Sequence, residues 1–191
     1  KNEFPVREFV GRIDFSSKAI GYGKTAMIFH MLKNITGEDI FYRSLRDFIK
    51  EKSFKKASWG DLGVIFERNY RKDLQWFFRQ WVDIAGIPDI YVESSQIKQG
   101  RNKYEFSFDI GQRGRVYAID VPLTIYYSDG FKKKVWVRAD KVKTGLTLSL
   151  ASMPEKIIMD EDYDIARKLS DDEIPPVIAR LLGDEKIIIV F

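Results

Sequence analysis

The stretch with the most obvious chemical potential runs from Ile20 to Ala26 and leads directly into the apolar residues Met27–Leu32. Its residues Gly23-Lys24-Thr25 end like the phosphate-binding loop G-x-x-x-x-G-K-[ST], whose backbone amides and lysine surround phosphates. The first glycine of that motif would fall on Lys18, whose side chain would stand where the loop must turn tightly. We therefore expect no nucleotide site here.

Tyr22 lies in the middle of the same stretch and is the candidate catalytic residue. A fixed phenolic hydroxyl can donate a hydrogen bond to an oxygen that gains negative charge during a reaction. The alternative is packing, because a tyrosine at the start of a buried helix usually fills a core with its hydroxyl hydrogen-bonded. The residue pattern alone leaves both interpretations open.

Metal and nucleophile chemistry is not expected from this chain, which has one histidine and no cysteine. A zinc site needs several ligands, and a catalytic triad needs a nucleophile beside a positioned base. His30 lies among apolar neighbours in the middle of a helical pattern, so we predict a hydrogen-bonded core or boundary residue. No cofactor is therefore predicted in this chain, and the absence of cysteine leaves the cellular compartment open.

The acidic run Asp160-Glu161-Asp162, with Asp164 close by, is the remaining candidate for a cation site. It lacks the central glycine and the alternating oxygen ligands of a calcium-binding loop. Acidic residues are also common in the first turn of a helix, where they interact favourably with the helix dipole. We predict that the run is the solvated start of a helix.

Charge and hydropathy argue against nucleic-acid and membrane partners. The net charge is +4, and Lys132-Lys133-Lys134 is the only compact basic cluster in the sequence. Three adjacent lysines are too few to form the extended basic surface that binds nucleic-acid phosphates. We interpret the cluster as part of a solvated hairpin. No apolar run approaches the ~18 residues needed to span a bilayer, so no membrane segment is predicted in this chain.

Residues 1–17 predict an irregular N-terminal segment, and the next seventy residues predict four amphipathic helices joined by short connections. The first helix runs from about Ser17 to Asn34, and the second begins with Thr36 as its N-cap. Ser58 caps the third helix with an acid at Asp61, and the fourth spans about 73–84. The residues expected to face the core are Ile28, Met31, Leu32, Ile35, Phe41, Leu45, Phe48, Ile49, Leu62, Ile65, Phe66, Tyr70, Leu74, Phe77, Phe78 and Trp81.

The hydrophobic period changes from 3.6 to 2 after Gly86-Ile87-Pro88. Alternating residues then predict strands up to Asp160, with a hairpin turn at Asp129-Gly130 that supplies positive φ angles. The fold class is therefore α+β, with helices followed by an antiparallel β-sandwich and a short helix-strand piece. That last piece has a capping box at 170–173, a helix through Val177–Leu182 and a terminal strand at 187–191.

These patterns predict three parts, at residues 1–87, 88–160 and 161–191. The chain starts without Met or a signal sequence and stops on an apolar strand-like run. We therefore expect it to be a fragment of a longer polypeptide.

Several short motifs follow one another in a recognisable order. They are Gly21–Ala26, Met31-Leu32, Thr36–Phe41, Leu45–Ile49, Asp61-Leu62 and Phe78–Pro88. This order resembles the later half of the catalytic domain of the gluzincin zinc aminopeptidases, the family of membrane alanyl aminopeptidase and leukotriene hydrolase. The family landmarks there are Y-x-K-G-A, a methionine-leucine helix, G-x-x-x-F and W-x-x-x-x-G-x-P before a β-sandwich. The resemblance covers residues 20–90 by motif and 100–160 by architecture.

The resemblance implies a role for Tyr22, which matches the family tyrosine whose hydroxyl stabilises the oxyanion of the tetrahedral intermediate in peptide hydrolysis. Matches with an expected structural role are Lys24, Trp81, Gly86 and Pro88. Thr25 replaces the family's usual glycine, which we expect to alter helix packing beside Tyr22.

The family's zinc-binding H-E-x-x-H, its downstream glutamate and its substrate-amine motif would all precede residue 1. We therefore expect zinc and a peptide substrate in the full-length protein, and no activity from this chain alone. Loss of that half would expose an apolar surface on the helices, which we expect to favour dimerisation. The alternative is a non-catalytic peptidase-like scaffold or protein-binding module.

Overall fold

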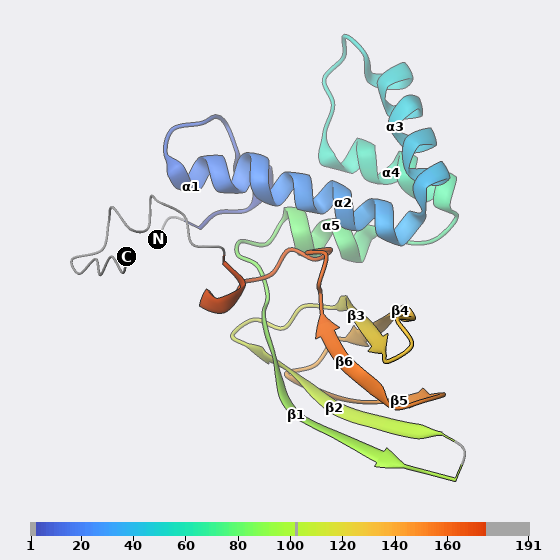
Figure 1. Cartoon of the computed structure of the whole chain (residues 1–191). Coiled ribbons are helices and arrows are strands. Elements are labelled where there is room, and N and C mark those ends of the chain that lie inside the picture. The colour runs from blue at the N-terminus through green and yellow to red at the C-terminus, as the bar shows by residue number, and fades with distance from the viewer. Residues whose placement is uncertain (1–2, 102, 175–191) are drawn as a thin grey trace, which may run out of the picture.

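The structure is a computed structural model that describes residues 3–101 and 103–174. It has α+β architecture, with the helices first and two antiparallel sheets after them, as predicted (Figure 1). The predicted helix at Val177–Leu182 and strand at 187–191 lie outside the described residues. Within the described part, no helix combines the length and the apolar character needed to cross a membrane.

The first helical element is longer than predicted and changes its geometry along its length. It begins as α1 (Phe15–Lys18), continues through a π-helical turn (Ala19–Lys24) and becomes α2 (Thr25–Thr36). Asp14 caps the start, because its carboxylate accepts a hydrogen bond from the Ser17 amide at 2.7 Å. The segment before it is mostly irregular, as predicted, with one short 3₁₀ turn at Val6–Glu8.

The predicted N-cap at Thr36 is wrong. Thr36 is the last residue of α2, and its hydroxyl donates to the Leu32 carbonyl at 2.8 Å. Gly37 is the N-cap of α3 (Glu38–Lys52) and has a φ angle of 82°. A threonine hydroxyl that bonds the carbonyl four residues earlier is not available to cap the next helix, and the positive φ favours glycine at the turn.

The next helices largely follow the prediction. Ser58 caps α4 (Trp59–Tyr70) in a capping box with Asp61, and α5 (Gln75–Val82) buries its predicted apolar face. Ile49 is the exception in α3, since it is 63% exposed. At roughly 100° per residue, Ile49 lies about 80° around the helix from Phe41, at the edge of the apolar stripe.

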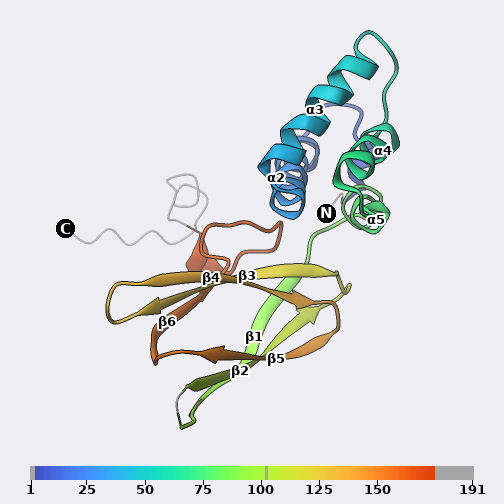
Figure 2. The same cartoon turned by 90° about the vertical axis from the view of Figure 1, so that its right-hand side faces the viewer.

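The strands form two three-stranded antiparallel sheets. One has the order β1 (Asp89–Gln99), β2 (Tyr104–Arg113), β5 (Lys143–Leu150). The other has the order β4 (Lys132–Ala139), β3 (Ile119–Tyr127), β6 (Pro154–Met159). Figure 2 shows them as two layers, with the β4-β3-β6 sheet nearer the helices.

The predicted hairpin at Asp129-Gly130 joins β3 to β4 and carries the exposed lysines of the basic cluster. Only Gly130 of this pair has a positive φ angle, at 83°.

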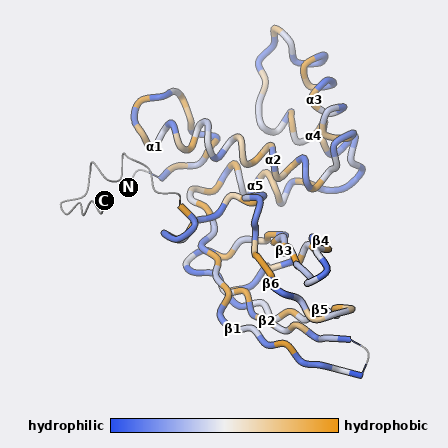
Figure 3. Tube along the Cα trace, in the orientation of Figure 1, coloured by the Kyte–Doolittle hydropathy of each residue, from blue (hydrophilic) through white to orange (hydrophobic). Residues whose placement is uncertain are grey.

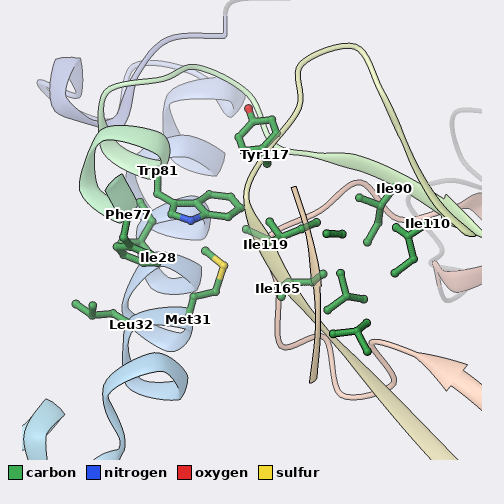
Figure 4. Packing of buried hydrophobic residues seen from close by; sticks show 14 of the residues in the cluster. Ile28, Met31, Leu32, Phe77, Trp81, Ile90, Ile110, Tyr117, Ile119 and Ile165 are labelled. Atoms are coloured by element: carbon green, nitrogen blue, oxygen red, sulfur yellow. The ribbon is translucent and has the colours of Figure 1, made fainter. Parts of the chain in front are cut away.

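Trp81 and Gln80 attach α5 to the start of β3. The Trp81 indole packs on the Tyr117 ring with centroids 5.5 Å apart, and Figure 4 shows it between α2 and the sheet. The Gln80 side chain accepts from the Ala118 amide at 2.7 Å and donates to the Ala118 carbonyl at 3.1 Å. The helices and the sheets therefore share one hydrophobic core.

The return segment, residues 160–174, leads from β6 back to the helices and corrects the prediction for the acidic run. Asp160 is not in a solvated helix start, because it has a φ angle of 52° and its side chain is fully buried. Its Oδ2 accepts from Arg167 Nε at 2.7 Å, and its Oδ1 accepts from the Asp164 amide at 2.7 Å. The buried Asp160 carboxylate thus stabilises the turn through hydrogen bonds to two later residues of the return segment.

His30 connects α2 to this return segment. Its Nε2 lies 2.8 Å from Asp164 Oδ1, and Lys134 Nζ lies 2.9 Å from the other oxygen of the same carboxylate. Burial opposes ionisation of Asp164, but the hydrogen bonds from Lys134 and His30 prevail and lower the pKa of Asp164. His30 is a half-buried, hydrogen-bonded boundary residue, as predicted.

Candidate functional site

Tyr22 lies in the π-helical turn and is 59% exposed. Its ring contacts the edge of Phe9, with centroids 5.8 Å apart and an interplanar angle of 77°. Within residues 3–101 and 103–174, no group is hydrogen-bonded to its hydroxyl. The interpretation of Tyr22 as a buried core residue is therefore wrong, and its catalytic role remains a prediction.

The packing of Phe9 against the π-helical turn depends on the glycine before Tyr22. A Cβ atom at Gly21 would lie 2.2 Å from the Phe9 ring, so only glycine lets this ring lie against the turn. Such turns are rare inside α-helices and occur frequently at functional sites. The Thr25 hydroxyl, at the position that departs from the family pattern, donates to the Ile20 carbonyl of this turn at 3.5 Å.

We predict that Gly21→Ala lowers the free energy of unfolding by about 1–3 kcal/mol, because the added methyl overlaps the Phe9 ring and must displace it. Urea denaturation monitored by circular dichroism measures the change. Gly23→Ala is the matched control in the same turn, since its Cβ would meet nothing within 4 Å. We expect the control to raise stability by about 0.5–1 kcal/mol, because alanine favours the helix more than glycine does. Equal losses in the two variants would show that the Phe9 contact is not what requires glycine.

Lys24 joins this turn to the loop after α5. It is 8% exposed, and its Nζ donates to the Ile84 carbonyl at 2.7 Å. Burial lowers the pKa of Lys24 to about 8, although the Glu3 carboxylate acts in the opposite direction. The contact fits the structural role expected for this lysine, because it connects two motifs about sixty residues apart in the sequence.

Two other matched residues, Gly86 and Pro88, lie in the same loop after α5. Gly86 has a φ angle of 85°, which favours glycine, and the Pro88 carbonyl accepts from the Lys168 amide at 2.9 Å. Pro88 is buried, and Trp81 is buried in the core. The structure thus brings Lys24 and the end of the Phe78–Pro88 motif together, as structural elements beside the π-helical turn.

Apolar side chains are exposed beside the π-helical turn. Val10, Ile13 and Phe15 are 89%, 82% and 89% exposed, and they precede Tyr22 in the chain. Figure 3 shows apolar positions recurring along this loop before α1. We call Val10, Ile13, Phe15 and Tyr22, which are each exposed and close in the sequence, the apolar face. Large exposed apolar patches on proteins commonly mark contact surfaces.

The described residues do not fit a zinc ion. They contain no group of three or more His, Cys, Asp or Glu side chains placed to hold a metal. The single histidine is hydrogen-bonded to Asp164 and Asn34.

Sequence comparison relates this chain to aminopeptidases. It is 29% identical to aminopeptidase M1 of Arabidopsis thaliana over 152 residues, which cover 76% of this chain and 17% of the relative. It is 23% identical to aminopeptidase N of Streptomyces lividans over 185 residues, which cover 86% of this chain and 21% of the relative. The chain is similar to one part of each of these aminopeptidases. It spans about a fifth or less of the length of these proteins, and no family model matches it.

The fold agrees with this relationship. The crystal structure of Legionella pneumophila aminopeptidase A superposes with a TM-score of 0.62 at 18% identity, covering 80% of this chain and 18% of that one. The fold is therefore shared with part of an aminopeptidase. Phe9, Arg167 and the return segment were not predicted from sequence as parts of this region, because they reach it only through tertiary contacts.

Proposed function

We propose that this chain is part of a zinc-dependent aminopeptidase-like protein that removes residues from the N-termini of peptides. The observation that carries the proposal is Tyr22, exposed in a π-helical turn with no hydrogen bond to its hydroxyl within the described residues. The similarity to aminopeptidases M1 and N supports it. The zinc ligands would belong to another part of the full-length polypeptide.

In this proposal the Tyr22 hydroxyl donates a hydrogen bond to the oxyanion of the tetrahedral intermediate. A fixed donor directed at developing charge stabilises a transition state more than it stabilises the substrate. Phe9 and Gly21 position the tyrosine, because the ring of Phe9 fills the space that a side chain at Gly21 would occupy.

We assign the parts of the chain accordingly. Residues 1–87 form the helical part of a peptidase catalytic domain, residues 88–160 a β-sandwich, and residues 161–191 the beginning of a further piece. The apolar face would be covered by the zinc-bearing part of the full-length protein. In the isolated chain this face would be free to associate with a second copy.

The test uses the full-length polypeptide that contains these residues. It should release the N-terminal residue from an aminoacyl p-nitroanilide, lose this activity with a zinc chelator and regain it when zinc is restored. The N-acetylated substrate is the control, because an aminopeptidase requires a free N-terminal amine. The proposal fails if the complete protein releases no N-terminal residue, or if chelation leaves the activity unchanged. Either result would favour the non-catalytic scaffold.

A further inference from the structure

A cavity of about 590 Å³ lies beside the π-helical turn, between it and the return segment. Much of its wall is apolar, and includes Ile20, Met27, Ile87, Ile165 and Leu169. Cavities of a few hundred cubic ångströms with an apolar wall and few polar groups are typical of small-molecule sites. The ligand class then depends on the polar groups in the wall.

Lys24 is a cationic group in this wall whose hydrogen-bond donors are not all used by the described residues. Its ammonium has three N–H donors, and the described residues supply one acceptor, the Ile84 carbonyl. Burial of an ammonium without a paired anion is costly, and the pKa of Lys24, lowered by burial to about 8, reflects that cost. At pH 7, which is below this pKa, the amine is still mostly protonated.

Of the other polar groups in the wall, Arg167 and Tyr163 are engaged, and Glu3 is an anion without an ion pair. Arg167 donates to Asp160 Oδ2 at 2.7 Å and to Glu173 Oε2 at 2.9 Å, so its charge is already balanced. The Tyr163 hydroxyl donates to the Glu173 carbonyl at 3.3 Å. Glu3 affects Lys24 through its charge, but no ion pair joins them among the described residues. Among the described residues, the cavity wall thus combines an incompletely bonded cation, Lys24, with apolar side chains and one carboxylate, Glu3.

We propose that this cavity binds a monocarboxylate carried on an apolar chain. The carboxylate would accept hydrogen bonds from Lys24 Nζ, and the chain would lie against Ile20, Met27 and Leu169. A fatty acid and the C-terminus of an apolar peptide share this chemistry. The inference does not depend on the proposed peptidase activity, because it uses neither Tyr22 nor zinc.

Calorimetric titration of the full chain with octanoate at pH 7 tests the proposal, with 1-octanol as the neutral control. Octanoate should bind at least about tenfold more tightly than octanol, because hydrogen bonds to a charged group contribute more than apolar contact alone. Lys24→Met should reduce octanoate affinity by roughly tenfold to a hundredfold. Lys18→Met, at an exposed lysine in the same helix, should leave the affinity unchanged.

A second variant covers the case in which Lys24→Met fails to fold. Glu3→Gln removes the negative charge that competes with the ligand and should raise octanoate affinity roughly two- to fivefold. Affinity should also fall as the pH rises above the pKa of Lys24, because the amine then loses its charge. Equal binding of octanol and octanoate, or weaker binding to Glu3→Gln, would overturn the proposal.

The two sources of the carboxylate are separated by a third titration. N-acetyl-leucyl-leucine with a free carboxylate is compared with its C-terminal amide, both against octanoate. Tighter binding of the free dipeptide than of octanoate assigns the cavity to peptide C-termini, and the reverse order assigns it to fatty acids. In both cases the carboxylate must bind more tightly than the matching neutral compound, which is octanol for octanoate and the amide for the dipeptide. If the amide binds as well as the acid and octanol as well as octanoate, the site does not recognise a carboxylate.

Discussion

An Asp160→Asn variant should lose about 3 kcal/mol of unfolding free energy, measured by urea denaturation at pH 7. The side chains of Asp160 and Arg167 are 0% and 1% exposed, and their bond is 2.7 Å long. Removing one member of a buried ion pair commonly costs about 3–5 kcal/mol, because the other charge stays buried without its partner. We expect the lower end of this range, since Glu173 would still bind Arg167.

The loss has a second origin in the hydrogen bonds of the turn. Asp160 accepts from Asp164 N and Arg167 Nε through different carboxylate oxygens. An asparagine side chain has one acceptor oxygen, so its NH₂ group would face a donor at one of the two contacts. Burial raises the pKa of Asp160 even though Arg167 opposes it, so desolvation is the larger effect on this carboxylate. The pair is therefore costly to bury and more costly to break.

Asp162→Asn is the control from the same acidic run. The Asp162 side chain is 60% exposed and pairs with Lys134 at the surface. Exposed pairs contribute about 0–1 kcal/mol, so this variant should remain close to the parent chain in stability. Similar losses in both variants would mean that the net charge of the run matters, and that the buried pair has no special contribution.

The regular elements could be predicted from sequence because their signals are local. The 3.6-residue spacing and the capping box at Ser58 determine the helices, and alternating residues such as Phe106 and Phe108 determine the strands. The position of His30 at a boundary also follows from local pattern, since a polar ring amid apolar neighbours needs a partner at the edge of the core.

The candidate site could be predicted only in part, because its geometry depends on contacts between distant residues. Motif resemblance identifies Tyr22, but it does not predict the Phe9 ring that packs against Gly21, twelve residues away. The sequence predicts a solvated acidic run, because runs of charged residues usually lie at the surface. Its buried partner Arg167 lies seven residues after Asp160, and no local spacing rule connects them.

Tyr22→Phe in the full-length protein should lower kcat by about 10²–10³-fold with little change in KM. The removed hydroxyl would interact with the oxyanion and not with the ground-state substrate, and loss of one oxyanion donor typically has an effect of this size. The ring itself is retained, so the edge contact with Phe9 should persist and the fold should be unaffected. Steady-state kinetics on an aminoacyl p-nitroanilide separates the two constants.

Tyr42→Phe is the matched control, since it removes the same atom from another exposed tyrosine, 44% accessible on α3. It should leave both kinetic constants unchanged. If Tyr22→Phe also leaves kcat unchanged in an active protein, Tyr22 serves only to pack against Phe9. If KM rises and kcat stays constant, the hydroxyl binds the substrate equally in the ground and transition states. An oxyanion donor requires a fall in kcat with KM unchanged, because such a donor stabilises the transition state and not the bound substrate.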